Sequence, residues 1–388
     1  MTVGIDRIAF FAPDTYVDLT DLAQARDVDP NKYLIGIGQS EQTVVPVTQD
    51  AVTMAANAAS KLLTETDRQA LGMVLFGTES GVDHSKSAAV YLRSLLDLPA
   101  SIRTVELKHA CYGATAGLMM AKDYVTLHPE KKVLVIGSDI ARYGLNTPGE
   151  VTQGGGAVAM LVSQNARILA LEDDSVVKSE DAMDFWRPLY RKEALVDGHA
   201  SENIYIDFFT AVFDDYQKLT GRTIEDFDAL AFHLPFTKMG LKALRAVLPQ
   251  ANDLKQQRLL EAFEASRVYN RRVGNLYTGS LYLSLMSLLA NGELPAGSRI
   301  GLFSYGSGAE GEFFAGQLMP DFDPQALQAD FAQFFGQRRR VSVPAYERLF
   351  NQSLPDHDVL LDTKADSARF VLRGITHDQR QYQDRTKA

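Results

Sequence analysis

The chain has 388 residues, a formal net charge of -10 and one cysteine. Its length is too great for one ordinary hydrophobic core and predicts two domains or one large duplicated unit. The acidic balance argues against nucleic acid as a partner. The single cysteine excludes an internal disulfide framework and any CxxC motif, which favours a reducing compartment, and we expect the cytoplasm.

Predicted strands and helices alternate through the first half of the chain, which indicates an α/β fold. Asp6 and Arg7 precede an apolar run that is too short for the core of a signal peptide. The longest apolar stretch, residues 281–290, is broken by serines and cannot span a bilayer, so no membrane partner is expected. The expected strands are 4–11, 70–78, 132–138, 157–163 and 168–172, and the expected helices are 18–26, 48–64, 85–96 and one that follows Cys111.

The second half repeats this order with little residue identity. A strand at 228–232 is followed by helices at 240–248 and 276–290, and strands at 298–305 and 312–318 flank a glycine-rich turn. We infer a structural duplication, with one half at residues 1–166 and the other at 167–388. Residues 173–203 are expected to be irregular. The segment from Pro320 is expected to be a helical appendage with a solvated arginine run at 338–340 and a polar tail from Thr376.

Cys111 lies just before a predicted helix that begins with small residues, among them Gly113 and Ala114. The unpaired N–H groups and the positive dipole end of a helix N-terminus favour a thiolate, which is a nucleophile. The alternative is that a lone cysteine in apolar surroundings is an inert core residue. Partner residues have to decide between these two interpretations.

Glu79 and His233 each follow a predicted buried strand, in the sequences ALGMVLFGTE and DALAFH. The carboxyl ends of strands face the cleft in open α/β folds, so both side chains are expected near Cys111. Each has a simpler interpretation, Glu79 as a solvated loop residue or helix cap and His233 as a half-buried structural histidine. Cysteine chemistry needs a thiol, a nearby acid or base and a hydrogen-bonding amide, and all three types are present.

Asn275 can supply that amide, although an asparagine ahead of a helix is also an ordinary N-cap. Ser307 lies between two glycines, where its backbone N–H and that of Cys111 would form an oxyanion hole, unless the segment is only a hairpin turn.

Five motifs in chain order resemble the 3-hydroxy-3-methylglutaryl-CoA synthases, in their compact bacterial form. They are GTES, ELKHACYGATAG, FHLPFTKM, VGNLYTGS and SYGSGAEGEFF, and the resemblance covers nearly the whole chain. It implies the thiolase fold, with two similar α/β halves in a layered α-β-α-β-α arrangement, and a homodimer. It implies no cofactor or metal, because acetyl-CoA and acetoacetyl-CoA are substrates of the reaction.

The resemblance also implies a reaction of the mevalonate pathway. Acetyl-CoA would acylate Cys111, and Glu79 would remove a methyl proton from the resulting thioester. The enolate would attack acetoacetyl-CoA, held by His233 and Asn275, and Glu79 would return a proton to the alkoxide. Water would then release the product from Cys111, with the amides near Cys111 and Ser307 stabilising the oxyanions.

Further substrate contacts are expected by the same analogy. Lys238 and Lys242 have helical spacing and would meet CoA phosphates, unless they are only an exposed helix face. Asp29 would lie near the adenine or pantetheine entrance. The acyl and pantetheine channel would be lined by Tyr143, Thr152, Phe185 and Ser201.

Two alternatives remain at this point. A ketoacyl-ACP synthase of the same fold also uses Cys, His and Asn, but it decarboxylates malonyl thioesters and needs no carboxylate base, so Glu79 discriminates against it. A non-catalytic acyl-CoA-binding scaffold would not acquire an acetyl group on Cys111.

Overall fold

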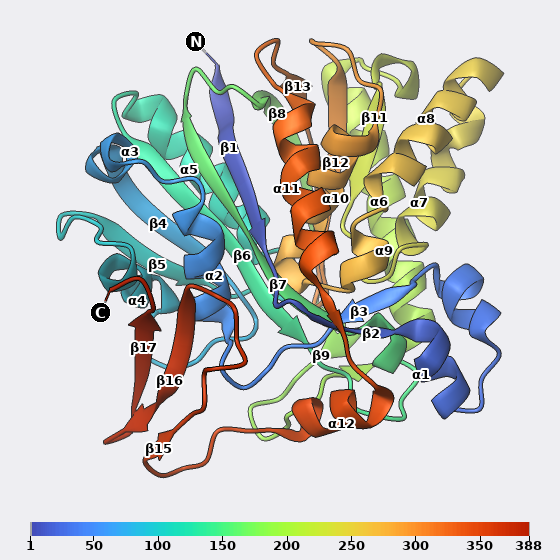
Figure 1. Cartoon of the computed structure of the whole chain (residues 1–388). Coiled ribbons are helices and arrows are strands. Elements are labelled where there is room, and N and C mark those ends of the chain that lie inside the picture. The colour runs from blue at the N-terminus through green and yellow to red at the C-terminus, as the bar shows by residue number, and fades with distance from the viewer. Residues whose placement is uncertain (1, 388) are drawn as a thin grey trace.

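The computed structural model describes residues 2–387, and a large mixed sheet runs through it (Figure 1). Within these residues nine strands join in the order β11-β12-β13-β8-β1-β7-β6-β4-β5. Their bounds are β1 Val3–Phe11, β4 Leu71–Gly77, β5 Arg103–Leu107, β6 Lys132–Ala141, β7 Gly154–Gln164, β8 Leu169–Ser179, β11 Ala229–Phe232, β12 Arg299–Gly306 and β13 Glu310–Leu318.

The two ends of this sheet follow the same pattern. In the first half, β7 pairs antiparallel with β1, β6 pairs antiparallel with β7, and β4 pairs parallel with β6. In the second half, β13 pairs antiparallel with β8, β12 pairs antiparallel with β13, and β11 pairs parallel with β12. β1 and β8 meet only at Gly4 and Ile5. This repeat agrees with the inferred duplication, while the boundary between residues 166 and 167 stays a prediction.

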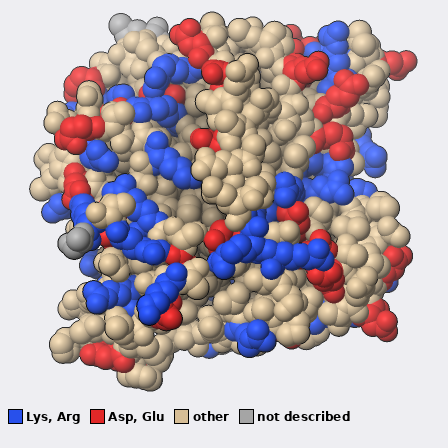
Figure 2. Space-filling view, viewed as in Figure 1, with Lys and Arg blue, Asp and Glu red and all other residues tan. Residues whose placement is uncertain are grey.

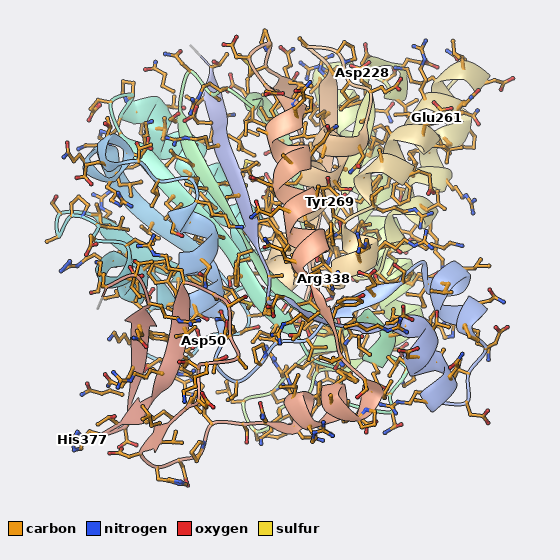
Figure 3. The ribbon with its side chains drawn as sticks, in the orientation of Figure 1. Asp50, Asp228, Glu261, Tyr269, Arg338 and His377 are labelled. Atoms are coloured by element: carbon orange, nitrogen blue, oxygen red, sulfur yellow. The ribbon has the colours of Figure 1, made fainter. Side chains whose placement is uncertain are left out.

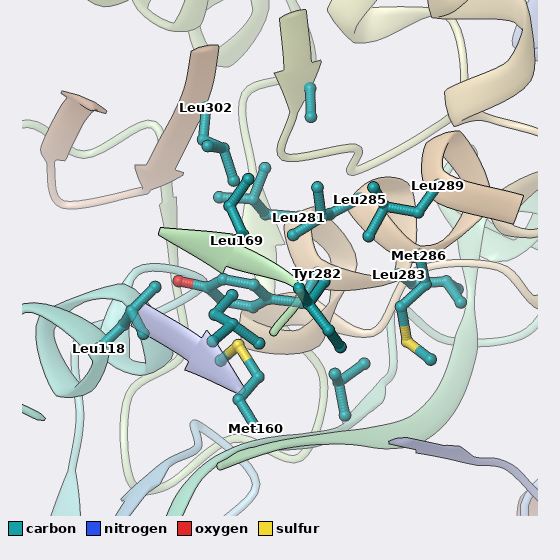
Figure 4. Packing of buried hydrophobic residues seen from close by; sticks show 14 of the residues in the cluster. Leu118, Met160, Leu169, Leu281, Tyr282, Leu283, Leu285, Met286, Leu289 and Leu302 are labelled. Atoms are coloured by element: carbon teal, nitrogen blue, oxygen red, sulfur yellow. The ribbon is translucent and has the colours of Figure 1, made fainter. Parts of the chain in front are cut away.

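Helices form layers on both sides of each half of the sheet. α5 (Gly113–Leu127) and α10 (Ser280–Asn291) lie in the middle layer, and one hydrophobic cluster joins them to strands from both halves (Figure 4). α2 (Ala51–Ser60) packs on β6 and β7, and α6 (Gly198–Thr220) packs on β8 and β13. The expected α-β-α-β-α layering is therefore present. No helix in residues 2–387 is long and apolar enough to cross a bilayer.

Smaller elements complete the chain around these layers. They are β2 Thr15–Asp18, α1 Leu19–Ala25, a π-helix at Lys32–Ile37, β3 Glu41–Thr43, α3 Glu65–Ala70, α4 Ala88–Leu95, α7 Met239–Val247, α8 Asp253–Ser266, α9 Asn270–Val273, α11 Pro324–Gln337, β14 Arg339–Arg340 and α12 Val343–Asn351.

The prediction of an irregular segment at residues 173–203 is wrong in three places. β8 continues to Ser179, a short hairpin joins β9 (Phe185–Trp186) to β10 (Leu195–Val196), and α6 begins at Gly198. Asp197 caps α6 by accepting a hydrogen bond from the backbone N–H of Ala200 at 3.1 Å.

The C-terminal appendage is only partly helical. After α11 and α12, the strands β15 (Val359–Leu360), β16 (Phe370–Thr376) and β17 (Gln379–Asp384) form a small sheet, which lies beside α2 and α4 in Figure 1. The polar tail expected from Thr376 is therefore largely a strand. Its polar side chains are used for anchoring, because the Tyr382 hydroxyl donates to Asp50 at 2.8 Å.

The arginine run was expected to be a solvated face, and this is wrong for Arg338, labelled near the end of α11 in Figure 3. The Arg338 side chain is fully buried and pairs with Glu41 at 2.6 Å. Arg339 pairs with Asp14 and Arg340 with Asp21 on the outside. Figure 2 shows Lys and Arg intermixed with Asp and Glu over the viewed face, without a broad basic surface there.

Candidate active site

Close packing between β4 and α5 brings Glu79 to Cys111. Gly77 ends β4, and a Cβ atom at this position would lie 2.4 Å from the backbone nitrogen of Ala114, in the first turn of α5. Only glycine allows the strand end and the helix start to approach this closely. Glu79 then reaches the residue that precedes the helix, and the Cys111 thiol donates a hydrogen bond to Glu79 Oε1 at 3.4 Å.

The second half of the chain presents its groups to the same place. Gly306, at the end of β12, lies against the backbone and Cβ of Tyr112, and the following Ser307 lines the same cavity as Cys111. His233 follows β11, and its backbone N–H donates to Phe303 of β12 at 2.9 Å. The neighbouring ends of β11 and β12 therefore carry one candidate group each.

A cavity of about 200 Å³ connects Cys111, His233 and Ser307. Glu79 does not line it and reaches it through its hydrogen bond with Cys111. Most of the residues expected to bind substrate line it: Cys111, Tyr143, Thr152, Phe185, Ser201, His233, Asn275 and Ser307. Apolar and small residues complete the lining, including Ile37, Pro148, Gly149 and Tyr277. A narrow, largely apolar cavity with a few converging polar groups is typical of small-molecule sites.

Asp29, Lys238 and Lys242 do not line this cavity. Asp29 is exposed in a turn, where its carboxylate accepts from the backbone N–H of Asn31 at 3.0 Å. Lys242 forms an ion pair with Glu202 at 2.5 Å. Lys238 lies between the lining residues Phe236 and Met239. Roles for these three residues toward a bound CoA stay predictions.

Glu79 is half-buried and lies near the buried carboxyl group of Asp139. Burial raises the pKa of its carboxyl to about 8, and the negative charge of Asp139 adds to the rise. The Arg187 guanidinium opposes this rise and donates a hydrogen bond to the Glu79 backbone carbonyl. A carboxyl group with this pKa can both accept and donate a proton near neutral pH.

The structure contradicts the expectation that Cys111 is a thiolate. Burial raises the pKa of the thiol well above its usual range, and the charges of Glu79 and Asp139 raise it further. Cys111 precedes the first helical residue, Gly113, and these two carboxylates outweigh the helix dipole there. Cys111 therefore rests as a thiol, with its sulfur 3.4 Å from Glu79 Oε1.

His233 is buried, and Asn275 is oriented by its hydrogen bonds. Burial lowers the pKa of the His233 imidazole to about 3, so the ring is neutral near pH 7. Asn275 Oδ1 accepts from the Tyr277 N–H at 2.9 Å and the Ser280 hydroxyl at 2.8 Å, and its Nδ2 donates to the Tyr143 hydroxyl at 3.1 Å. These contacts turn the amide nitrogen toward the cavity.

The comparisons with known proteins agree over the whole chain. Residues 1–167 match the family described as hydroxymethylglutaryl-coenzyme A synthase N terminal, and residues 246–352 match the C-terminal description. The hydroxymethylglutaryl-CoA synthase of Enterococcus faecalis is 50% identical over 385 residues, which cover 99% of this chain and 100% of that protein. The chain belongs to the hydroxymethylglutaryl-CoA synthase family.

A crystal structure of an HMG-CoA synthase complexed with CoA has the same fold. It superposes with a TM-score of 0.96 at 42% sequence identity and covers 99% of this chain and 100% of that chain. The fold is thus thiolase-like, as expected. The chain is also similar to the polyketide biosynthesis 3-hydroxy-3-methylglutaryl-ACP synthase of Bacillus subtilis, with 31% identity over 91% of this chain and 89% of that protein.

Sequence reasoning missed several groups that shape this synthase site. Asp139, at the end of β6, is fully buried and accepts from the backbone N–H groups of Glu79 and Ser80 at 2.8 and 2.9 Å and from the Thr278 hydroxyl at 2.6 Å. It follows the buried strand KVLVIGS, the same signal that identified Glu79 and His233.

Asp184 was also missed, and no comparable signal marks it. This buried carboxylate accepts from the Tyr305 hydroxyl at 2.8 Å and the Gly308 N–H at 3.0 Å, and it thereby holds the turn that carries Ser307. It lies in a segment that the sequence pattern left irregular.

Proposed function

We propose that the cavity at Cys111 condenses acetyl-CoA with acetoacetyl-CoA and water to give 3-hydroxy-3-methylglutaryl-CoA and CoA, the carbon–carbon bond-forming reaction of the family. The observation that carries this proposal is the hydrogen bond between Cys111 Sγ and Glu79 Oε1, 3.4 Å long. It joins a nucleophile for acyl transfer to a carboxyl group whose pKa, raised to about 8, suits a general base.

Acetyl transfer comes first. Glu79 takes the thiol proton as Cys111 Sγ attacks the carbonyl carbon of acetyl-CoA, and the CoA sulfur leaves and takes up that proton. The products are acetyl-Cys111, free CoA and an ionised Glu79. Because the thiol already points at Glu79, no rearrangement is needed for this proton transfer.

Condensation follows on the acetylated enzyme. Glu79 removes a proton from the acetyl methyl group, and the enolate carbon attacks the ketone carbon of acetoacetyl-CoA. Glu79, now protonated, returns its proton to the new tertiary alkoxide. Water then hydrolyses the thioester to Cys111, which releases 3-hydroxy-3-methylglutaryl-CoA and restores the thiol.

Neutral hydrogen-bond donors would hold the acceptor substrate. The imidazole of His233 and the Nδ2 group of Asn275 face the cavity and suit the oxygens of acetoacetyl-CoA. The backbone amides at Cys111 and Ser307 would stabilise the enolate and tetrahedral oxyanions. Lys238, Lys242 and Asp29 would meet the CoA portion outside the cavity.

The product is an intermediate of the mevalonate pathway. The absence of a second cysteine in the sequence suits the reducing cytoplasm.

We also propose a homodimer. β5 ends the large sheet, and it exposes Val105 beside α5, where Met120 is exposed as well. An open, apolar sheet edge is suited to pairing with a second copy.

Glu79→Gln tests the reaction. We expect the condensation rate to fall by at least about 100-fold, the contribution typical of a general base. Acetylation of Cys111 should be slowed less, because a thiol is a much stronger acid than a methyl group. Mass spectrometry after incubation with acetyl-CoA measures the first step, and consumption of acetoacetyl-CoA absorbance measures the second.

The matched control is Glu106→Gln. Glu106 is a partly buried carboxyl on β5 that accepts from the Ala88 N–H at 2.6 Å, whereas Glu79 accepts from the Cys111 thiol. This control should keep both steps. Equal losses of acetylation and condensation in Glu79→Gln would contradict the assigned role, and no acetyl group on wild-type Cys111 would contradict the reaction itself.

A further inference from the structure

One wall of the cavity is a loop that connects β6 to β7. Within residues 142–153, Tyr143, Pro148, Gly149 and Thr152 line the cavity. Tyr143 is packed beside Cys111 in a small cluster, and its hydroxyl accepts from Asn275 Nδ2 at 3.1 Å. The placement of this loop therefore decides where Tyr143 and Asn275 meet a bound acyl group.

Gln153 fixes the start of the loop. Its side-chain carbonyl accepts from the backbone N–H groups of Tyr143 at 2.7 Å and Gly144 at 3.1 Å. Its Nε2 donates to the hydroxyl of Tyr346, on α12, at 2.9 Å. Gln153 is 2% exposed and Tyr346 is 1% exposed, so water does not replace either partner readily.

Glu150 fixes the middle of the loop to the same helix. Its carboxylate accepts from the Tyr346 hydroxyl at 3.2 Å and from the Asn146 N–H at 2.9 Å. Arg26, which directly follows α1, donates to both of its oxygens, at 2.9 and 2.7 Å, and pairs with Glu347 of α12 at 2.7 Å. The Tyr346 hydroxyl is thus the atom shared by both loop anchors.

A separate contact joins α12 to the first residue of the loop. Arg142 Nη2 donates to the carbonyl of Phe350 at 2.6 Å, and the guanidinium lies 3.9 Å from the centre of the Phe350 ring. α12 belongs to the C-terminal appendage and does not itself line the cavity. Its polar contacts nevertheless hold the cavity wall at three points.

We propose that Tyr346 is a positioning residue for acceptor binding. Its hydroxyl accepts from Gln153 and donates to Glu150, and by doing so it holds Tyr143, and through it Asn275, in the geometry that receives acetoacetyl-CoA. This inference rests on the proposed function of the cavity. It assigns to the C-terminal helix a part in substrate affinity.

Tyr346→Phe removes one oxygen and keeps the ring that packs among Val17, Leu22 and Val151. Gln153 then loses its buried acceptor and is expected to turn, which frees the N–H groups of Tyr143 and Gly144. We expect the KM for acetoacetyl-CoA to rise about three- to tenfold. The kcat per acetylated site should change less than about twofold, because Glu79 and Cys111 keep their own contacts.

Tyr382→Phe is the matched control. Tyr382 is also in the C-terminal appendage and donates a hydroxyl hydrogen bond to a carboxylate, Asp50, at 2.8 Å, but neither residue lines the cavity. A general loss of stability would affect both variants. A rise in KM for Tyr346→Phe alone supports the proposal, while unchanged KM values or equal shifts in both variants overturn it.

Cys111 provides a second measurement that needs no turnover. It is the only cysteine in the sequence, so the rate of alkylation by iodoacetamide reports on this cavity alone. Tyr346→Phe should alkylate several times faster than wild type and Tyr382→Phe at the wild-type rate. If wild type catalyses no condensation, the proposed function is wrong, and the alkylation rates still decide the role of Tyr346.

A second variant covers the case in which Tyr346→Phe does not fold. Arg142→Met removes the separate tie to Phe350 and leaves the contacts of Glu150 intact. It should raise the KM for acetoacetyl-CoA and the alkylation rate in the same direction. Wild-type values for both quantities in this variant would overturn the proposal.

Discussion

Glu79 must be ionised to accept a proton, and its surroundings oppose ionisation. Burial and the Asp139 charge raise its pKa to about 8. The condensation rate of the acetylated enzyme should therefore fall about tenfold per pH unit below 8 and level off above it. Single-turnover reactions of acetyl-enzyme with acetoacetyl-CoA between pH 6 and 9.5, at about half-unit steps, measure this profile. A flat profile across this range would contradict the assignment of Glu79 as the base.

The same shift has a consequence for stability that serves as a control. The folded protein holds the Glu79 proton up to about pH 8, whereas an unfolded glutamate loses it near pH 4.3. Between these values unfolding releases a proton, so this group lowers the free energy of unfolding as pH rises. Glu79→Gln should raise the melting temperature at pH 9 and leave it nearly unchanged at pH 4.

Several site residues were predictable because of where they stand relative to strands and helices. Glu79 and His233 follow buried strands, and the structure brings both to the cysteine that precedes α5. The thiol state of Cys111 was not predictable from a helix N-terminus, since it depends on burial and on the charges of Glu79 and Asp139, which follow separate strands. Ionisation depends on three-dimensional neighbours, which local sequence does not specify.

At the scale of elements, the contact between β4 and α5 sets the distance from base to nucleophile. A Cβ at Gly77 would lie 2.4 Å from Ala114 N and 2.7 Å from its Cα, both backbone atoms that cannot rotate away. Gly77→Ala should push α5 from the strand, lengthen the contact between Glu79 and Cys111, and destabilise the fold by about 1–3 kcal/mol. Activity should fall by more than the loss of folded protein explains.

Gly336→Ala is the control for that substitution. A Cβ there meets nothing within 4 Å, and the residue lies in α11, where alanine is a better helix former than glycine. Its activity should stay at the wild-type level, with equal or slightly higher stability. Urea unfolding and steady-state rates, measured together on both variants, separate stability from geometry. Wild-type activity in Gly77→Ala would show that the contact is not needed.

The elements that were missed share a physical reason. α6 carries Tyr205, Phe208, Phe209 and Phe213 on its buried side, a helical spacing that was overlooked because the preceding residues look irregular. β16 and β17 are short, and Tyr382 of β17 is held by Asp50, the N-cap of α2, which is distant in the sequence. Such strands are specified by distant partners, so local patterns identify them poorly.

On the scale of the whole molecule, the site exists only where the two halves of the chain meet. The first half supplies Glu79 and Cys111, and the second supplies His233, Asn275 and Ser307. Asp139 joins them, because it accepts hydrogen bonds from the backbone N–H of Glu79 and from the Thr278 hydroxyl. In the proposed reaction, the first half thus provides the acid–base and nucleophilic groups, and the second half provides His233 and Asn275 for the acceptor.

The edge of the large sheet is where a second copy would bind. β5 pairs only with β4 among the described strands, and Val105 is 41% exposed on it. If two copies pair through this edge, Val105→Lys places two like charges close together in a desolvated contact, which opposes association. Sedimentation velocity at micromolar concentration should show the mass of two chains for wild type and a shift toward one chain for Val105→Lys.

Leu360→Lys is the matched control for this experiment. Leu360 is 71% exposed on β15, in the small C-terminal sheet, so the substitution adds the same charge at a different sheet edge. It should keep the wild-type mass. A wild-type mass of one chain would contradict the dimer, and a Val105→Lys variant that stays a dimer would place the interface on another surface. β5 leads directly into the segment that carries Cys111, so a change at this edge can reach the site. Loss of pairing between the two copies should therefore also lower activity.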